Sequence, residues 1–183
     1  MGTERKLLVM GSAYCLDADL SKVDVADYDV MAVNHAGVHY PGKLRYWASV
    51  HPEFFTGKKK IDYIGERKSC GYDMDFLLVF PWKDIWTPEW PKFIEIRFDK
   101  LAGTSGLYAA RAGLALGYTD ITLAGVPMRA SEGSLQYGEV WPGFRTSKTK
   151  NAHRSAWIRA KDEEFKGRVR SLSGWTREIL SGE

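Results

Sequence analysis

The chain contains little cysteine and no long hydrophobic run. Its two cysteines, Cys15 and Cys70, form no Cys-x-x-Cys pair, so the sequence signals neither a disulfide framework nor a zinc site. The apolar run Leu7–Met10 is too short for a signal peptide, and no run approaches the length of a membrane span. We therefore expect a protein without a membrane span, located in the cytoplasm.

A strong charge of either sign is also absent. The formal net charge is +3 over 183 residues, which is too small to indicate a nucleic-acid partner by itself. Apolar residues make up 44% of the chain and charged residues 27%, a globular composition that argues against disorder. The length predicts one domain over residues 1–183, with a substantial core. The sequence does not determine the oligomeric state, and a homo-oligomer is one open possibility.

Short apolar runs recur along the chain and predict the fold class. They are KLLVM at 6–10, VMAV at 30–33, YWASV at 46–50, FLLVF at 76–80, FIEIRF at 93–98 and ITLAGV at 121–126. Continuous runs of this length are typical of strands buried on both faces of a parallel sheet. Helices are predicted at 105–117 and near 151–180, with a C-terminal helix over 160–181. We therefore expect a single α/β domain, a mostly parallel sheet flanked by helices, whose strand order the sequence does not reveal.

Several of these runs end at a small or polar residue. In open α/β sheets, ligands bind just beyond the carboxyl ends of the strands. This rule predicts a site whose members all follow a strand or begin a helix: Gly11, Ser12, Asn34, His51, Ser105, Gly106 and Gly125.

The start of the predicted helix 105–117 has two open interpretations. Thr104 or Ser105 can cap it, because a side-chain oxygen there accepts a hydrogen bond from an otherwise unpaired amide. Gly106 weakens the first turn. It either allows close packing, or it lets an anion approach the exposed amides, where the helix dipole favours negative charge.

A basic segment at residues 141–159 predicts a lid over bound phosphates. It carries five cations and no acid, namely Arg145, Lys148, Lys150, Arg154 and Arg159, together with aromatic residues and His153. Arginine binds phosphate in a bidentate manner and aromatic rings stack on bases, which suits a lid. Arg129, directly after the last predicted strand, would lie between the start of the helix at 105–117 and the basic lid. The alternative interpretation is a solvated charged face.

Two histidines are candidates for catalysis. His51 follows the third apolar run and His35 follows the second, so both belong to the predicted rim of the site. Imidazole titrates near neutral pH, and either side chain could accept a proton from an acceptor hydroxyl. For His51 the alternative is a cap on the turn that follows.

The chain resembles a known group of proteins in the stretches LLVMGSAYCL, VNHAG, YWASVHPEFF and SGLYAARAGLALGYTDITLAGV. These stretches are similar to bacterial family-42 sialyltransferases and to archaeal 6-hydroxymethylpterin diphosphokinases, which share a Rossmann-like, nucleotide-binding sheet. The ending RVRSLSGWTREILSG is similar to small proteins of bacteriophages. The resemblance implies that Gly11 and Ser12 line phosphates, that Asn34 binds ribose or base, and that Ser105 and Gly106 hold a phosphate or sugar.

Two departures from the family pattern bear on the chemistry. The first loop reads Gly-Ser-Ala-Tyr-Cys where the sialyltransferases have Gly-x-Gly-Pro-Ser. The last predicted strand ends in Gly125-Val126-Pro127 where those families have Gly-x-Asp, so an acidic metal ligand is missing. We expect no metal and no cofactor, and a nucleotide or nucleotide-sugar as ligand.

Three functions remain open at this stage. The first is a metal-independent, glycosyltransferase-like enzyme that uses a nucleotide-sugar donor. The second is a non-catalytic phage protein that binds a nucleotide or a nucleic-acid end. The third is a pyrophosphokinase, which would need Mg²⁺ and carboxylates to hold it.

Overall fold

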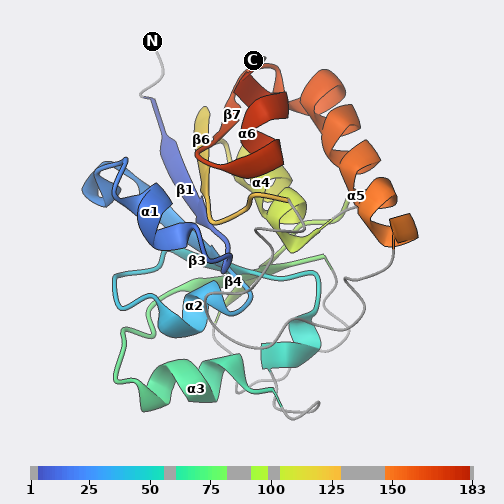
Figure 1. Ribbon diagram of the computed structural model, residues 1–183. Coiled ribbons are helices and arrows are strands. Elements are labelled where there is room, and N and C mark those ends of the chain that lie inside the picture. The colour runs from blue at the N-terminus through green and yellow to red at the C-terminus, as the bar shows by residue number, and fades with distance from the viewer. Residues whose placement is uncertain (1–3, 56–60, 82–91, 99–103, 129–146, 182–183) are drawn as a thin grey trace.

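The computed structural model describes residues 4–55, 61–81, 92–98, 104–128 and 147–181, with the backbone alone at 147–152 (Figure 1). The described residues form one seven-stranded sheet in the order β5-β4-β3-β2-β1-β6-β7, with every neighbouring pair parallel. The strands are β1 Lys6–Met10, β2 Asp29–Val33, β3 Tyr46–Ala48, β4 Leu77–Phe80, β5 Phe93–Glu95, β6 Asp120–Ala124 and β7 Val169–Ser171. The predicted α/β class and the six predicted strands are confirmed.

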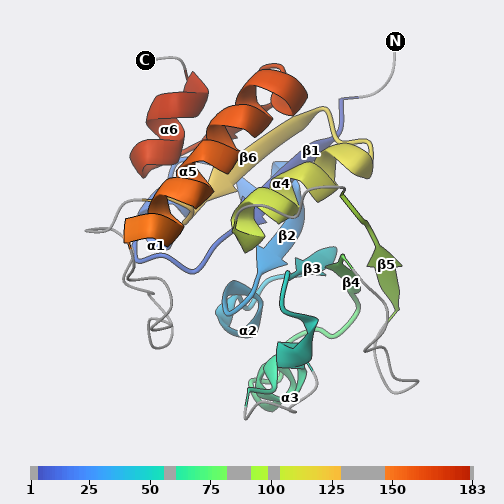
Figure 2. The same cartoon turned by 90° about the vertical axis from the view of Figure 1, so that its right-hand side faces the viewer.

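Helices cover both faces of this sheet. One face carries α4 Ser105–Ala115, α5 Ser147–Ala160 and α6 Gly174–Ser181. The other carries α1 Leu16–Leu20, α2 Ala36–His39 and α3 Tyr63–Ser69, and short 3₁₀ turns lie at Val25–Asp27 and Pro52–Phe55. Figure 2 shows α4, α5 and α6 on one side of the strands, with α2 and α3 on the opposite side.

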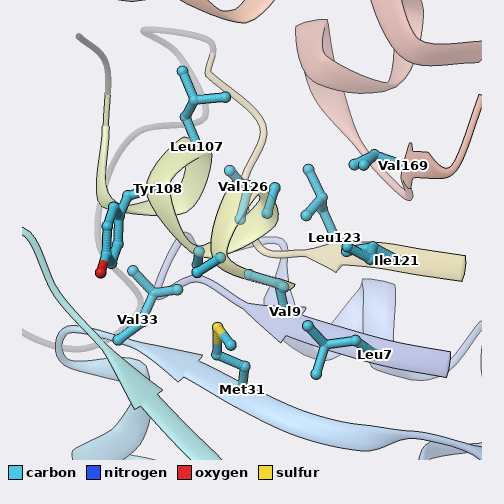
Figure 3. Close-up of a cluster of buried hydrophobic side chains, with 14 of the residues drawn as sticks. Leu7, Val9, Met31, Val33, Leu107, Tyr108, Ile121, Leu123, Val126 and Val169 are labelled. Carbon is cyan, nitrogen blue, oxygen red and sulfur yellow. The ribbon is translucent and has the colours of Figure 1, made fainter. Parts of the chain in front are cut away.

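Alternate residues of strands β1 to β6 supply two cores. Leu7 and Val9 of β1 pack under α4, whereas Leu8 and Met10 pack toward α1 and α2. All four side chains are fully buried, so their alternation produces a continuous apolar run rather than an amphipathic one. Figure 3 shows the α4 side of this arrangement.

The helix after β5 has the predicted start and end. The Thr104 side chain accepts a hydrogen bond from the Leu107 amide at 3.3 Å, which makes Thr104 the N-cap. Gly117 adopts φ 84°, and the Tyr118 amide donates to the Gly113 carbonyl at 3.1 Å. This left-handed glycine ends the helix as the sequence predicts.

The predicted C-terminal helix is present as α6 Gly174–Ser181, but its predicted span of 160–181 is too long. After α5, a π-helical turn at Lys161–Phe165 runs into Lys166 and Gly167, both with positive φ, and β7 follows. Phe165 ends the π-helical turn and Val169 lies on β7, and both side chains are buried in the core. No helix among the described residues is long and apolar enough to cross a membrane.

Candidate functional site

All carboxyl ends of the strands lie at one edge of the sheet, because every pair is parallel. The chain reaches this edge at Gly11 after β1, Asn34 after β2, Ser49 after β3 and Gly125 after β6. From β1 the chain builds outward to β5 and then returns to place β6 on the other side of β1. Ligands of open α/β sheets bind outside such a switch point, so this edge is the candidate site.

A hydrogen-bonded network joins the ends of β2 and β3. The Ser49 hydroxyl donates to the side-chain oxygen of Asn34 at 2.8 Å and accepts a bond from the His51 amide, also at 2.8 Å. The Asn34 carbonyl accepts the Trp47 indole N–H at 2.8 Å. Asn34 has φ 51°, a left-handed conformation that asparagine tolerates better than most residues. Asn34 is therefore held through both its backbone and its side chain.

His51 lies at the rim beside an acid. Its ring nitrogen Nδ1 is 3.5 Å from the Glu53 carboxylate, and its ring packs on Phe54 with centroids 5.3 Å apart. The side chain is 40% exposed, so part of it faces solvent at the carboxyl edge. The position suits a group that meets a substrate.

His35 lies at the same edge but belongs to a packed cluster. Its Nε2 is 3.8 Å from Glu66, and its ring contacts Tyr63 and His39 at 5.0 and 5.8 Å between centroids. Burial lowers the pKa of His35, while Glu66 acts in the opposite direction. Of the two predicted histidines, His51 is the more exposed.

The two glycines at the switch point face each other. A Cβ on Gly11 would lie 2.3 Å from the Gly125 carbonyl oxygen, and one on Gly125 would lie 2.5 Å from the Gly11 carbonyl oxygen. Gly125 also has φ 66°. The close approach of two backbones therefore explains both glycines without a ligand. Next to them, Ser12 is half-buried, and its hydroxyl makes no hydrogen bond to another described residue.

The structure gives Gly106 a packing cause. Gly106 is buried, and a Cβ there would lie 2.9 Å from Cγ1 of Val126, the residue after Gly125. Figure 3 shows Val126 in the cluster between α4 and the strands. Of the two open interpretations of Gly106, the packing one has direct structural support. Ser105 is also buried, and its hydroxyl accepts a 3.5 Å bond from the Val50 amide.

Sequence reasoning missed a buried acid beneath this edge. Asp19 of α1 is 0% exposed, and its Oδ2 accepts bonds from the Gly125 amide at 2.9 Å and the Ser173 hydroxyl at 2.6 Å. Its Oδ1 lies 2.8 Å from Lys22 Nζ. Asp19 thus ties α1 to the loops after β6 and β7. No local pattern signals this junction, because the Gly125 amide and the Ser173 hydroxyl lie 106 and 154 residues away.

The described part of the segment predicted as a basic lid forms α5, where Trp157 is fully buried in the core and so is not placed to stack on a base. An Arg154 nitrogen lies 3.5 Å from the carbonyl oxygen of Met128, beyond the end of β6, and the guanidinium stacks 4.8 Å from the Trp175 ring centroid. His153 precedes it, and burial lowers its pKa. Lys148 lies on α5, although its side chain is outside the described part of the chain. Arg129 and Arg145 lie outside the described residues altogether.

The described residues contain no cluster of three or more His, Cys, Asp or Glu side chains that could hold a metal ion. The candidate site therefore consists of hydroxyl, amide and imidazole groups at the carboxyl edge, with the Arg154 guanidinium nearby. Such groups bind anions and polar ligands by hydrogen bonding.

No protein-family model and no curated protein sequence matches the chain. Its fold is similar to that of the sialyltransferase CstII from Campylobacter jejuni in complex with cytidine-5′-monophosphate, with a TM-score of 0.59 at 16% identity over 97% of this chain and 88% of that chain. CST-II in complex with a trisaccharide acceptor and CMP gives 0.58 at 18% identity, over 92% and 81%. The monofunctional α-2,3-sialyltransferase Cst-I from Campylobacter jejuni gives 0.58 at 16% identity, over 100% and 80%.

These likenesses confirm the predicted sialyltransferase-like fold. They show the fold alone, since fold does not determine chemistry at such low identity. The resemblances to the pterin diphosphokinases and to phage proteins stay predictions.

Proposed function

We propose that this chain binds a nucleotide-sugar at the carboxyl edge of its sheet and transfers the sugar to an acceptor hydroxyl without a metal ion. The observation that carries the proposal is the convergence of Ser12, Asn34 and His51 at the ends of three adjacent parallel strands. The sialyltransferase-like fold supports it, because solved structures of that fold hold CMP.

In the proposed reaction His51 is the general base. The acceptor hydroxyl oxygen forms a bond to the anomeric carbon, while the bond from that carbon to the phosphate oxygen breaks and its electron pair leaves with the phosphate. The hydroxyl proton moves to His51. Glu53, 3.5 Å from Nδ1, favours a proton on that nitrogen and so leaves Nε2 as the accepting atom.

Cationic side chains would stabilise the leaving phosphate in place of a metal. Arg154 is the described member of this group, and we propose Arg129, Arg145 and Lys148 as further members. Asn34 and Ser12 would donate hydrogen bonds to the nucleotide, and His35 and Ser105 would complete the rim.

A panel of nucleotides tests the proposal by thermal shift. CMP or UDP at about 100 times its dissociation constant should stabilise the fold by about 2.7 kcal/mol, which raises the melting temperature by roughly 5–10 °C. Stabilisation without Mg²⁺ supports the proposal. Stabilisation by ATP only with Mg²⁺ would favour a pyrophosphokinase. If no nucleotide raises the melting temperature, the proposed enzymatic function is refuted.

Turnover then separates an enzyme from a binding protein. His51→Ala should keep CMP binding and lose sugar transfer from the donor. His35→Ala, at the same rim, is the matched control variant. Equal transfer by His51→Ala and the unmodified chain would exclude His51 as base. Nucleotide binding without transfer to any acceptor or water would favour the non-catalytic alternative.

A further inference from the structure

Ser49 is a buried hydroxyl group that links two residues of the candidate site. It follows β3 directly, is 0% exposed, and contacts Asn34 on one side and the His51 amide on the other. The backbone amide of Ser49 donates to the Val79 carbonyl at 3.1 Å, which fixes where the hydroxyl stands.

The direction of each bond follows from the burial of Ser49. The His51 amide can only donate, so the Ser49 oxygen accepts there. The Ser49 proton must then find an acceptor, because a buried hydroxyl without one is destabilising. The Asn34 side-chain oxygen, 2.8 Å away, is the acceptor in this network. With the amide turned over, an N–H would face the hydroxyl and leave the Ser49 proton unpaired.

The same network determines what Asn34 presents to a ligand. Its side-chain oxygen is engaged by Ser49, and its backbone carbonyl accepts bonds from the Trp47 indole at 2.8 Å and the Gly37 amide at 3.1 Å. The side-chain NH₂ makes no hydrogen bond to another described residue, and Asn34 is half-buried at the carboxyl edge. The group left for a ligand is therefore a donor.

We propose that Ser49 is a positioning residue that holds the Asn34 amide with its NH₂ toward the ligand, so that the site selects an oxygen that only accepts hydrogen bonds, as phosphate and base carbonyl oxygens do. This inference rests on the proposed function and adds to it the kind of ligand atom at Asn34. A ligand hydroxyl could use either end of the amide and would not need Ser49.

A double-mutant cycle on CMP affinity tests the role of Ser49. Ser49→Ala should weaken CMP binding about threefold to tenfold, the effect of releasing one ordered side chain. In an Asn34→Ala background the same change should have no effect, because Ser49 acts through Asn34. Ser49→Thr keeps the hydroxyl and should keep the affinity. Equal losses in both backgrounds would reduce Ser49 to a structural residue and overturn the inference.

A second variant tests the inference even if Ser49→Ala folds poorly. Asn34→Asp keeps the acceptor for Ser49 but replaces the outward donor by a negatively charged oxygen. It should bind CMP more than tenfold less tightly than Asn34→Ala does, because two acceptors then face each other. Affinity equal to that of the unmodified chain would show a donating ligand group and overturn the inference. If the unmodified chain binds no nucleotide, this inference and the proposed function both fail. If it binds CMP but Ser49 and Asn34 show no coupling in the double-mutant cycle, only the proposed role of Ser49 is refuted.

Discussion

Removing the buried carboxylate of Asp19 should destabilise the whole carboxyl edge. In Asp19→Ala the buried Gly125 amide loses its acceptor, and the Ser173 hydroxyl keeps only the weak contact to Cys15 Sγ at 3.2 Å. An orphaned donor costs about 1–3 kcal/mol, with Ser173 at the low end because it is half-buried. We expect the free energy of unfolding to fall by about 3 kcal/mol. With a urea m-value of about 2 kcal/mol/M, the unfolding midpoint falls by roughly 1.5 M.

Asp19→Asn separates hydrogen bonding from charge. Its side-chain oxygen can take the place of Oδ2 and accept both bonds, while its NH₂ replaces Oδ1, loses the contact to Lys22 and turns a buried donor toward the ammonium group. Lys22 is 46% exposed, and such a contact contributes about 1 kcal/mol or less. The exposed Asp27, on the turn before β2, is the matched control and should change stability by no more than about 0.5 kcal/mol as Asp27→Ala. A loss below about 1 kcal/mol for Asp19→Ala, or a larger loss for Asp19→Asn than for Asp19→Ala, would refute this account.

Three further changes test other parts of the structure. Gly125→Ala should lower the free energy of unfolding by about 3 kcal/mol or more, because its Cβ would lie 2.5 Å from a carbonyl oxygen. Gly71→Ala, at φ 74° with no atom within 4 Å, should lower it by only about 1 kcal/mol, and equal losses in urea would contradict the packing argument. Thr104→Ala should lower the free energy of unfolding by about 1 kcal/mol in the same assay. Thr104→Ser should lower it much less, since serine also caps helices. An unchanged unfolding midpoint in Thr104→Ala would exclude Thr104 as the cap. Burial lowers the pKa of His35 below 6.5, so the unfolded chain takes up the proton more readily and stability decreases as pH falls below that value. Between about pH 7.5 and 5.5, the melting temperature of His35→Gln should therefore fall less than that of the unmodified chain. Equal decreases would exclude His35 as the cause of the pH dependence.

The placement of the candidate residues at one edge of the sheet could be predicted from local pattern, but the physical reason for each residue type could not. Apolar runs ending in Gly11, Asn34 and His51 indicate buried parallel strands, and parallel strands bring their carboxyl ends together. The same reasoning assigned Gly106 to packing or to an anion without deciding between them. The decision came from Val126, which is twenty residues further along the chain and packs against it.

The amino-acid sequence by itself determined the fold class, the positions of six strands and the end of α4, and it limited the cap of α4 to Thr104 or Ser105, because these depend on side-chain periodicity and on neighbours within one turn. Only the tertiary structure revealed β7, the Asp19 junction and the orientation of the Asn34 amide. Each of these depends on a contact between segments far apart in the sequence, such as Asp19 with Ser173 or Thr122 of β6 with Arg170 of β7. Hydrogen bonds and close packing of this kind exist only after the sheet has brought those segments together, so no local pattern encodes them.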